Sequence, residues 1–543
     1  MTPKKPSKDT PTPSGYLALV LHAHLPFVRH PEHERFLEED WLFEAITETY
    51  LPLLEIMEGW TKDAMDWRLT MSLTPSLCSM LLDPLLQERY NKHLRNLIEL
   101  SEKEVQRTGA HPELNKLAVY YLDSFKKCQH YYNEVYHQNI PGAFNKFQIA
   151  GNLEIITCSA THGFMPLMQH HPAAVRAQVR TGVEHYQKTF GRSPRGTWNA
   201  ECGFFPGLDK VLADHGIEYF FADSHALILG EHLPKYGVFA PIETPAGPLA
   251  FGRDQESSRS VWSAQNGYPG DPSYREFYRD IGFDLDLDYL RPHMHSGDQR
   301  SALGIKYHKI TGQETPLPEK HLYNPWEARE TADRHAGHFM FCRQQQVLHL
   351  NTLMEERPPL IVSPYDAELF GHWWYEGPQF LDFLVRKLYF DQTDIRLTNA
   401  AEYMALYPEN QVSMPSVSSW GFGGFSEVWL EGSNDWIYRH LDQIAVRMTA
   451  LANQFPTASG LQLRALNQCA REVLLAQSSD WAFIMKTNTV VDYAVKRIKT
   501  HVLQFHKLDE MLTKNTLDEE YLKSLEWRDN LFREIDYRVY QDK

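Results

Sequence analysis

The chain has 543 residues and a formal net charge of −16 at neutral pH. Because nucleic-acid-binding proteins concentrate positive charge on one face, this acidic balance argues against a polyanion as partner and favours a neutral polymer. No stretch approaches the ~18 consecutive apolar residues of a membrane span, and the N-terminus lacks the pattern of a secretion signal. We therefore expect neither a nucleic acid nor a membrane as a partner.

The cysteine spacing indicates a reducing compartment. The six cysteines are scattered along the chain, with no CxxC pair and no spacing typical of a disulfide framework. We therefore expect free thiols and a soluble, cytoplasmic protein. Residues 1–15 are rich in proline, lysine, serine and threonine and predict a flexible tail.

The first predicted strand covers residues 16–21 and ends at His22 and His24. Because side chains alternate along a strand, both imidazoles point to the same side. Such a pair at a strand end can bind zinc, or it can donate hydrogen bonds to sugar hydroxyls. A purely structural role for the two histidines is the third possibility.

Strands and helices then alternate, with one long interruption. Residues 41–58 have helical spacing, residues 68–73 resemble a second strand, and residues 76–149 are charged and helical, which predicts an insertion. A strand at 154–158 and a helix at 173–190 follow. Alternating strands and helices, with functional residues at the strand ends, are typical of an α/β barrel.

Glu201 lies where a strand gives way to a sharp turn. It follows a short apolar segment around Trp198 and precedes Gly203 and Gly207, so strand, turn and helix start follow in quick succession. A carboxylate at this place points into the mouth of the barrel. The neighbouring Cys202 is the weaker candidate for a nucleophile, because no basic partner is evident and adjacent strand side chains point to opposite faces.

A second carboxylate, Asp366, directly follows the strand-like run 360–362. Tryptophan, tyrosine, phenylalanine and histidine residues surround both acidic positions in the sequence. Sugar rings stack on aromatic side chains, while one carboxylate attacks the sugar and the other provides a proton. The two carboxylates and their aromatic neighbours therefore predict glycosidic chemistry.

Two further regions depart from the alternation. Residues 225–322 form loops rich in glycine, proline and aromatic residues, and long loops in a compact protein are usually functional. After a last strand at 395–397 comes a glycine-rich aromatic loop at 418–425. Residues 435–540 are almost wholly helical by period.

Five ordered segments resemble glycoside hydrolase family 57 and, within it, the 1,4-α-glucan branching enzymes. They are residues 21–29, 151–164, 198–204, 363–377, and 418–421 together with Trp429. A weaker match surrounds Asp480, within residues 477–483. The resemblance therefore covers nearly the whole chain.

The resemblance implies an α/β fold with seven βα units. We expect a (β/α)7 catalytic barrel at residues 16–415, with a helical insertion at 76–149 and long active-site loops at 225–322. An all-helical C-terminal domain would occupy residues 416–543.

The resemblance also implies a retaining mechanism without a metal or an organic cofactor. Glu201 would be the nucleophile and Asp366 the proton donor and base, acting in a monomer on α-1,4-glucan as donor and acceptor. Tyr236 would lie in a mobile loop that covers the cleft. The other substrate-binding residues implied are His22, His24, Trp41, Arg253, Gly270, Trp262, Trp420, Trp429 and Asp480.

The sequence leaves structural roles possible for two of these residues and other functions possible for the protein. Trp262 has loop packing as its alternative, and Asp480 has helix N-capping. An α-amylase or 4-α-glucanotransferase of the same family would use the same carboxylates without forming α-1,6 branches. A zinc-dependent carbohydrate esterase would use His22 and His24 as ligands, and a binding protein would hold glucan without turnover.

Overall fold

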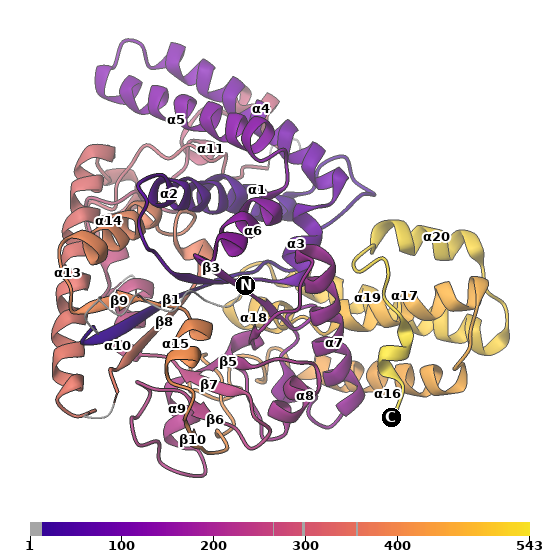
Figure 1. Cartoon of the computed structure of the whole chain (residues 1–543). Helices are drawn as coiled ribbons and strands as arrows, with labels where there is room; N and C mark the ends of the chain where they lie inside the picture. The colour runs from indigo at the N-terminus through magenta and orange to yellow at the C-terminus, as the bar shows by residue number, and fades with distance from the viewer. Residues whose placement is uncertain (1–12, 264, 296–298, 355–356, 543) are drawn as a thin grey trace.

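The computed structural model describes residues 13–263, 265–295, 299–354 and 357–542 (Figure 1). Strands lie at its centre, helices surround them, and the last helices, drawn in orange and yellow, extend to one side. Of the predicted N-terminal tail, residues 1–12 lie outside the described residues. Gly15 is already the first residue of a strand.

Seven parallel strands form the central ring: β1 (Gly15–Ala23), β2 (Leu69–Leu73), β3 (Leu153–Cys158), β4 (Gly196–Trp198), β5 (Tyr219–Ala222), β7 (Leu249–Gly252) and β8 (Leu360–Asp366). Consecutive strands pair from β1 to β5, β7 pairs with β5, and β8 pairs with β1. The backbone N–H of Asp254 bridges the gap between β7 and β8, because it donates to the carbonyl of Val362 at 2.8 Å. The predicted (β/α)7 barrel is confirmed.

The ring strands are buried on both faces, which explains their apolar sequences. All nine residues of β1 and all five of β2 are buried, as expected of parallel strands that are covered by helices outside and packed side chains inside. Three short strands lie outside the ring: β6 (Ile242–Glu243) pairs with β7, β10 (Gln411–Val412) with β6, and β9 (Ile395–Leu397) with β1.

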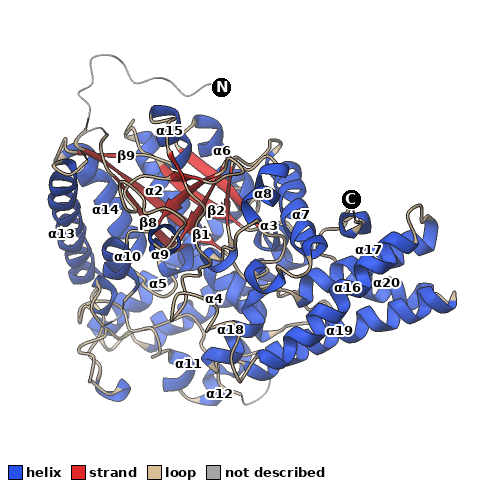
Figure 2. Ribbon diagram, turned by 90° about the horizontal axis from the view of Figure 1, so that it is seen from below, coloured by secondary structure: helices blue, strands red, loops and turns tan. Residues whose placement is uncertain are grey.

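Helices enclose the ring (Figure 2). Those of the barrel part are α1 (Asp40–Glu44), α2 (Leu51–Lys62), α7 (Pro172–Phe190), α8 (Leu208–Asp214), α9 (Ser224–Ile228), α10 (Gln255–Trp262), α13 (Pro325–Asn351), α14 (Gly377–Phe390) and α15 (Ala400–Leu406). A π-helical stretch, Ala45–Tyr50, joins α1 to α2. The long loops contain the short helices α11 (Ile281–Asp284) and α12 (Leu287–Leu290).

The predicted helical insertion separates β2 from β3. It consists of α3 (Pro75–Leu81), α4 (Pro84–Arg107), α5 (Pro112–His130) and α6 (Ile140–Ala150). Asp83 begins α4, because its carboxylate accepts hydrogen bonds from the free N–H groups of Leu85 and Leu86. α4 and α5 pack together at the top of Figure 1.

The C-terminal helices are α16 (Tyr438–Gln454), α17 (Gly460–Ala476), α18 (Ser479–Thr487), α19 (Val491–Lys514) and α20 (Glu519–Arg528). α17 packs against α19, and its apolar positions Leu466 and Val473 are fully buried. The start of α18 turns toward the barrel, where the N–H of Ser479 donates to the carbonyl of His162 at 3.0 Å. The predicted C-terminal helical domain is thus in contact with the end of β3.

The sequence also predicted free thiols and no membrane-spanning segment. All six cysteines are free, and five of them are buried. Within the ranges given above, each helix is too short or too polar to cross a membrane.

Candidate active site

Glu201 lies just beyond β4, in a tight turn at Ala200–Cys202. The backbone of Glu201 is left-handed, with φ of 62°, and so is that of Cys202, with φ of 51°. This conformation costs about 1–3 kcal/mol for each non-glycine residue and persists where the surrounding structure enforces it. Gly203 completes the turn, since a Cβ there would collide with Phe164 and the carbonyl of Ala200. The turn holds the Glu201 carboxylate at the mouth of the barrel.

Cys202 belongs to the same turn as Glu201. Glu201 and Cys202 lie past the end of the strand, so strand alternation does not separate their side chains. Cys202 is fully buried, and burial raises the pKa of its thiol well above the usual value. The thiol is therefore protonated and unsuited to act as a nucleophile.

Two side chains donate hydrogen bonds to the Glu201 carboxylate. The indole N–H of Trp420 donates to Oε2 at 2.9 Å, and the hydroxyl of Ser479 donates to Oε1 at 2.8 Å. The backbone N–H of Trp420 also donates to the carbonyl of Glu201 at 2.9 Å. Both carboxylate oxygens are thus fixed in direction by groups from the aromatic loop and from α18.

Asp366 is the last residue of β8, and the strand register places it opposite His22 of β1. Its side chain is open to solvent, unlike that of Glu201. Two positions later, the carboxylate of Glu368 accepts hydrogen bonds from the hydroxyl of Tyr50 at 2.5 Å and from the backbone N–H of His24 at 3.2 Å. These bonds tie the turn after Asp366 to the end of β1 and to the π-helical stretch.

Burial raises the pKa of Glu201 to about 8. Asp366 still reaches solvent, but the protein around its carboxyl displaces much of the bulk water there and raises its pKa to about 6. The bonds from Trp420 and Ser479 favour ionised Glu201 and oppose the rise of its pKa, whereas the charge of Asp366 adds to it. His24 and Arg253 favour ionised Asp366. Between about pH 6 and about pH 8 the pair therefore carries one proton.

Three histidines and a tryptophan form a stack beside the carboxylates. The His22 ring lies 4.8 Å from that of Trp198 and 5.0 Å from that of His162, and His24 lies 3.8 Å from His162. Nε2 of His22 is 2.9 Å from Nε2 of His162. Burial lowers the pKa of His22 and of His162 well below the usual value, so these two rings are neutral hydrogen-bonding groups.

Asp480 lies in the first turn of α18 but does not cap the helix. Its carboxylate instead accepts from Nε2 of His24 at 3.0 Å and from the hydroxyl of Ser478. Burial alone would raise the pKa of Asp480, but the contact with His24 and the hydrogen bond from Ser478 hold it at about 2. The structural alternative of an N-cap is therefore not supported, and Asp480 joins the histidine stack to the C-terminal domain.

His24, His162 and Asp480 lie close enough together to be considered as metal ligands. The ring nitrogens of both histidines are nevertheless engaged, those of His24 by Thr74 and Asp480 and those of His162 by Ser479 and His22. The two rings also stack with an interplanar angle of 17°. Lone pairs lie in the ring plane, so stacked rings direct them in parallel and not toward one ion. This arrangement fits hydrogen bonding better than zinc ligation.

Arg253 also reaches the site. Its guanidinium pairs with Asp223 at 2.5 Å and lies 5.9 Å from the ring centre of Trp420. Both residues follow barrel strands, Asp223 after β5 and Arg253 after β7. The structure thus brings together these predicted residues: Glu201, Asp366, His22, His24, Arg253, Trp420 and Asp480.

The structure places Tyr236 away from the cleft that it was expected to cover. The chain must return from the end of β5 to the start of β7, and Tyr236 lies on that return, with the guanidinium of Arg357 5.8 Å from its ring centre. Nearby, the carbonyl of Phe239 accepts from the N–H of Leu360, the first residue of β8. Tyr236 therefore lies at the N-terminal ends of the strands, opposite to Glu201.

The four other predicted contacts lie elsewhere in the described residues. Trp429 is 1% exposed and stacks on Phe164 at 4.6 Å, so it supports the loop and offers no face to a sugar. Trp262 is 52% exposed at the end of α10. Gly270 ends a turn that packs on α13 and α14 through Tyr268. Trp41 packs edge-on against Tyr493 of α19.

Sequence reasoning missed three residues of the site: His162, Ser479 and Glu368. His162 and Ser479 lie inside the segments that carried the family resemblance, but a hydrogen bond to a residue hundreds of positions away leaves no local pattern. Glu368 carries a visible signal, because it follows Asp366 by two positions in a strand-to-turn segment.

Comparisons with known proteins show the family to which the chain belongs. The family model described as "Glycosyl hydrolase family 57" matches residues 18–416. The chain belongs to glycosyl hydrolase family 57. A second model, "1,4-alpha-glucan branching enzyme, C-terminal", matches residues 440–540. The first matched region contains Glu201 and Asp366, and the second contains Ser479 and Asp480.

Individual family members cover almost the whole chain. The 1,4-alpha-glucan branching enzyme TK1436 of Thermococcus kodakarensis is 31% identical over 96% of this chain and 78% of its own length. The α-amylase AmyC of Thermotoga maritima is 46% identical, with 97% of this chain and 99% of that chain covered and a TM-score of 0.91. The branching enzyme of Pyrococcus horikoshii is 30% identical, with coverages of 98% and 97% and a TM-score of 0.86.

Proposed function

We propose that the protein is a 1,4-α-glucan branching enzyme that cleaves an α-1,4 bond and re-forms it as an α-1,6 branch. One observation carries the proposal. The C-terminal region that matches the branching-enzyme model places Ser479 and Asp480 at the catalytic end of the barrel, where Ser479 donates to Glu201 at 2.8 Å. This region therefore contributes to the chemistry directly and is more than an appended domain.

Glu201 acts as the nucleophile in the proposed mechanism. Its carboxylate attacks the anomeric carbon of an α-1,4-linked glucose and forms a glycosyl-enzyme, while Asp366 protonates the departing glycosidic oxygen. The singly protonated pair provides one nucleophile and one acid. In the free site the higher pKa of Glu201 places the shared proton there. The reactive form has this proton on Asp366, and the positive charge that develops at the anomeric carbon in the transition state stabilises ionised Glu201 in that form.

The second step transfers the glucan chain. Asp366, now ionised, removes the proton from the 6-hydroxyl of another glucan, and that oxygen attacks the anomeric carbon and releases Glu201. Two inversions at the same carbon retain the α configuration. Glu201, fixed by Trp420 and Ser479, is buried, and exclusion of water favours transfer over hydrolysis.

The remaining residues of the site bind and orient the sugar. His22, His24 and Arg253 offer hydrogen-bond donors, and Trp420 offers an aromatic surface. Asp480 fixes the orientation of His24, because its carboxylate holds Nε2 of that ring. Trp41, Trp262 and Gly270 would contact longer parts of the glucan chain. The protein would work as a cytoplasmic monomer on a glycogen-like polymer, without a cofactor.

An α-amylase is the second candidate, and two observations favour it. The Thermotoga maritima structure, which is 46% identical, is described as an α-amylase. Tyr236 also lies away from the cleft, so it does not screen the glycosyl-enzyme from water. A zinc-dependent esterase has weaker support, because Thr74, Asp480, Ser479 and His22 occupy the histidine nitrogens that would bind the metal.

Incubation with amylose separates these functions. The products are treated with a debranching enzyme, the released chains are sized, and new α-1,6 linkages are counted against new reducing ends. A branching enzyme gives more linkages than reducing ends, an α-amylase gives the reverse, and a 4-α-glucanotransferase gives longer linear chains. Dialysis against a chelator leaves turnover unchanged if no metal is used, whereas loss of turnover that zinc restores would support metal chemistry.

A further inference from the structure

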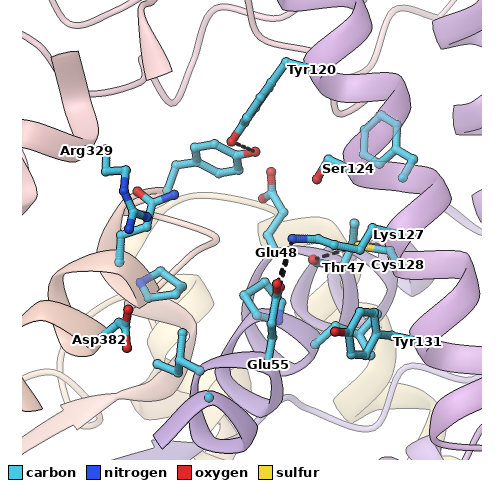
Figure 3. A pocket seen from close by; sticks show the side chains of 18 of the residues that line it. Thr47, Glu48, Glu55, Tyr120, Ser124, Lys127, Cys128, Tyr131, Arg329 and Asp382 are labelled. Carbon is cyan, nitrogen blue, oxygen red and sulfur yellow. Dashed lines mark hydrogen bonds and ion pairs between the residues drawn. The ribbon is translucent and has the colours of Figure 1, made fainter. Parts of the chain in front are cut away.

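A second cavity lies outside the catalytic site, between the π-helical stretch, α2, α5 and α14 (Figure 3). Its volume is about 330 Å³, at the lower end of the roughly 300–1,000 Å³ of small-ligand sites. α14 follows strand β8 and therefore begins near Asp366, at the catalytic end of the barrel. Glu48 and Tyr375, which lie at that end, line the cavity.

Tyrosine side chains line this cavity at both ends. The hydroxyls of Tyr120 and Tyr375 are 3.0 Å apart, and the guanidinium of Arg275 lies 3.8 Å from the ring centre of Tyr375. Tyr131 lines the opposite end of the cavity (Figure 3) and is half-buried. Tyrosine rings offer an apolar face together with a polar hydroxyl edge, as sugars require.

The charges around the cavity are balanced. Lys127 pairs with Glu55 at 2.9 Å, and Arg386 pairs with Asp382 at 2.8 Å. Figure 3 shows the ion pair of Lys127 and Glu55 across the lower part of the cavity. A phosphate or nucleotide requires an excess of positive charge that these pairs do not leave, whereas a neutral polyol can bond to both partners.

Two side chains offer acceptor oxygens to a ligand with hydroxyl donors, since a carboxylate oxygen that already accepts one bond can accept another. Oε1 of Gln379, a residue that lines the cavity, is buried and has no hydrogen-bond partner among the described residues. Such an atom costs stability unless a donor reaches it. The Glu48 carboxylate, which pairs with Arg275 at 2.8 Å and with His372 at 3.1 Å, points into the same space.

We propose that this cavity is a second glucan-binding site, which holds one or two glucose units of the same polymer that the catalytic site cuts. Sugar hydroxyls would donate to Gln379 and Glu48, and a pyranose ring would lie against Tyr120 or Tyr131. The inference rests on the proposed glucan substrate. A polymer held at two places on one protein gains effective concentration at the catalytic site, whereas a short oligosaccharide reaches only one of them.

Tyr131→Ala and Gln379→Ala test the site separately. We expect either substitution to raise KM for amylose about three- to tenfold and to leave kcat and the kinetics with maltoheptaose unchanged. Tyr389→Ala is the matched control, because Tyr389 is 44% exposed on α14 and does not line the cavity. Thermal melts check that each variant is folded.

Crystals of Glu201→Gln soaked in maltoheptaose give an independent answer. Sugar density beside Tyr131 and Gln379 would support the second site. An unchanged KM for amylose in a folded variant, together with an empty cavity in the soaked crystal, would overturn it. A wild-type protein that turns over no α-glucan would overturn the proposed function, and the soaked crystal would then still decide whether the cavity binds sugar.

Discussion

The hydroxyl of Ser479 donates a hydrogen bond to the carboxylate of Glu201 at 2.8 Å, although the two residues are 278 positions apart in the sequence. Ser479 opens α18 of the C-terminal helical part, and Glu201 follows strand β4 of the barrel. The next residue, Asp480, binds His24 at the end of β1. Two parts of the chain therefore build the surroundings of one carboxylate.

Ser479→Ala removes this bond and tests its contribution. A hydrogen bond to a charged group contributes about 1.5–3 kcal/mol, so we expect kcat to fall about 10- to 100-fold. The lost bond favours ionised Glu201, so its removal raises the pKa of Glu201 and moves the alkaline limb of the pH profile upward. Ser524→Ala, an exposed position on α20, should change neither quantity. A variant with normal kcat and an unmoved profile would show that Ser479 is only structural.

The pH dependence of kcat/KM reports the two carboxyls. Below about pH 6 both carboxyls are protonated and the nucleophile is lost, and above about pH 8 both are ionised and the acid is lost. We therefore expect a bell-shaped profile on short maltooligosaccharides with limbs near these values. A profile that stays flat from pH 5 to pH 9 would be incompatible with a carboxyl pair that shares one proton.

Glu201→Gln keeps the shape of the side chain and removes the nucleophile. We expect turnover of amylose to fall at least ~1,000-fold, while retention of the protein on an amylose gel stays as in the wild type. Glu218→Gln serves as the control, because Glu218 pairs with Arg195 at the start of β5, far from the carboxylate pair. Activity above about a tenth of wild type would remove Glu201 from the nucleophile's role.

Tyr236→Ala distinguishes the structure from the expectation based on family resemblance. Because Tyr236 lies beside Arg357 at the N-terminal ends of the strands, we expect the ratio of α-1,6 linkages to reducing ends to stay within about twofold of wild type. A several-fold fall of that ratio would mean that the loop moves to the catalytic end during the reaction, as the resemblance implies.

The sequence pattern was sufficient to predict an α/β barrel and to place both carboxylates after barrel strands, whereas the number of seven βα units came from the family resemblance. Continuous apolar runs before His22 and before Asp366 mark buried parallel strands, and side chains that follow such strands meet at one end of a barrel. Glu201 could be singled out for the same reason, because it follows an apolar strand segment. Its left-handed backbone could not be predicted. A turn of that kind depends on the packing of Phe164 and Ala200 around Gly203 and has no local sequence pattern.

The contacts between distant segments were beyond the sequence. Ser479 and Glu201, or Asp480 and His24, become partners only when α18 docks against the end of β3. The position of Tyr236 could not be predicted for a related reason. The long loop between β5 and β7 must lead to the start of β7, and the place where β7 begins determines its path. A loop's composition does not indicate at which end of a barrel its residues lie.

Covalent labelling tests the central claim most directly. The protein is incubated with a fluorinated glucosyl fluoride that forms a slowly hydrolysed glycosyl-enzyme, digested, and mapped by mass spectrometry. We expect one glycosylated peptide, with the sugar on Glu201, and no label in the Glu201→Gln variant. A sugar on Asp366, Glu368 or Asp480, or catalytic turnover without a covalent intermediate, would contradict the proposed retaining mechanism.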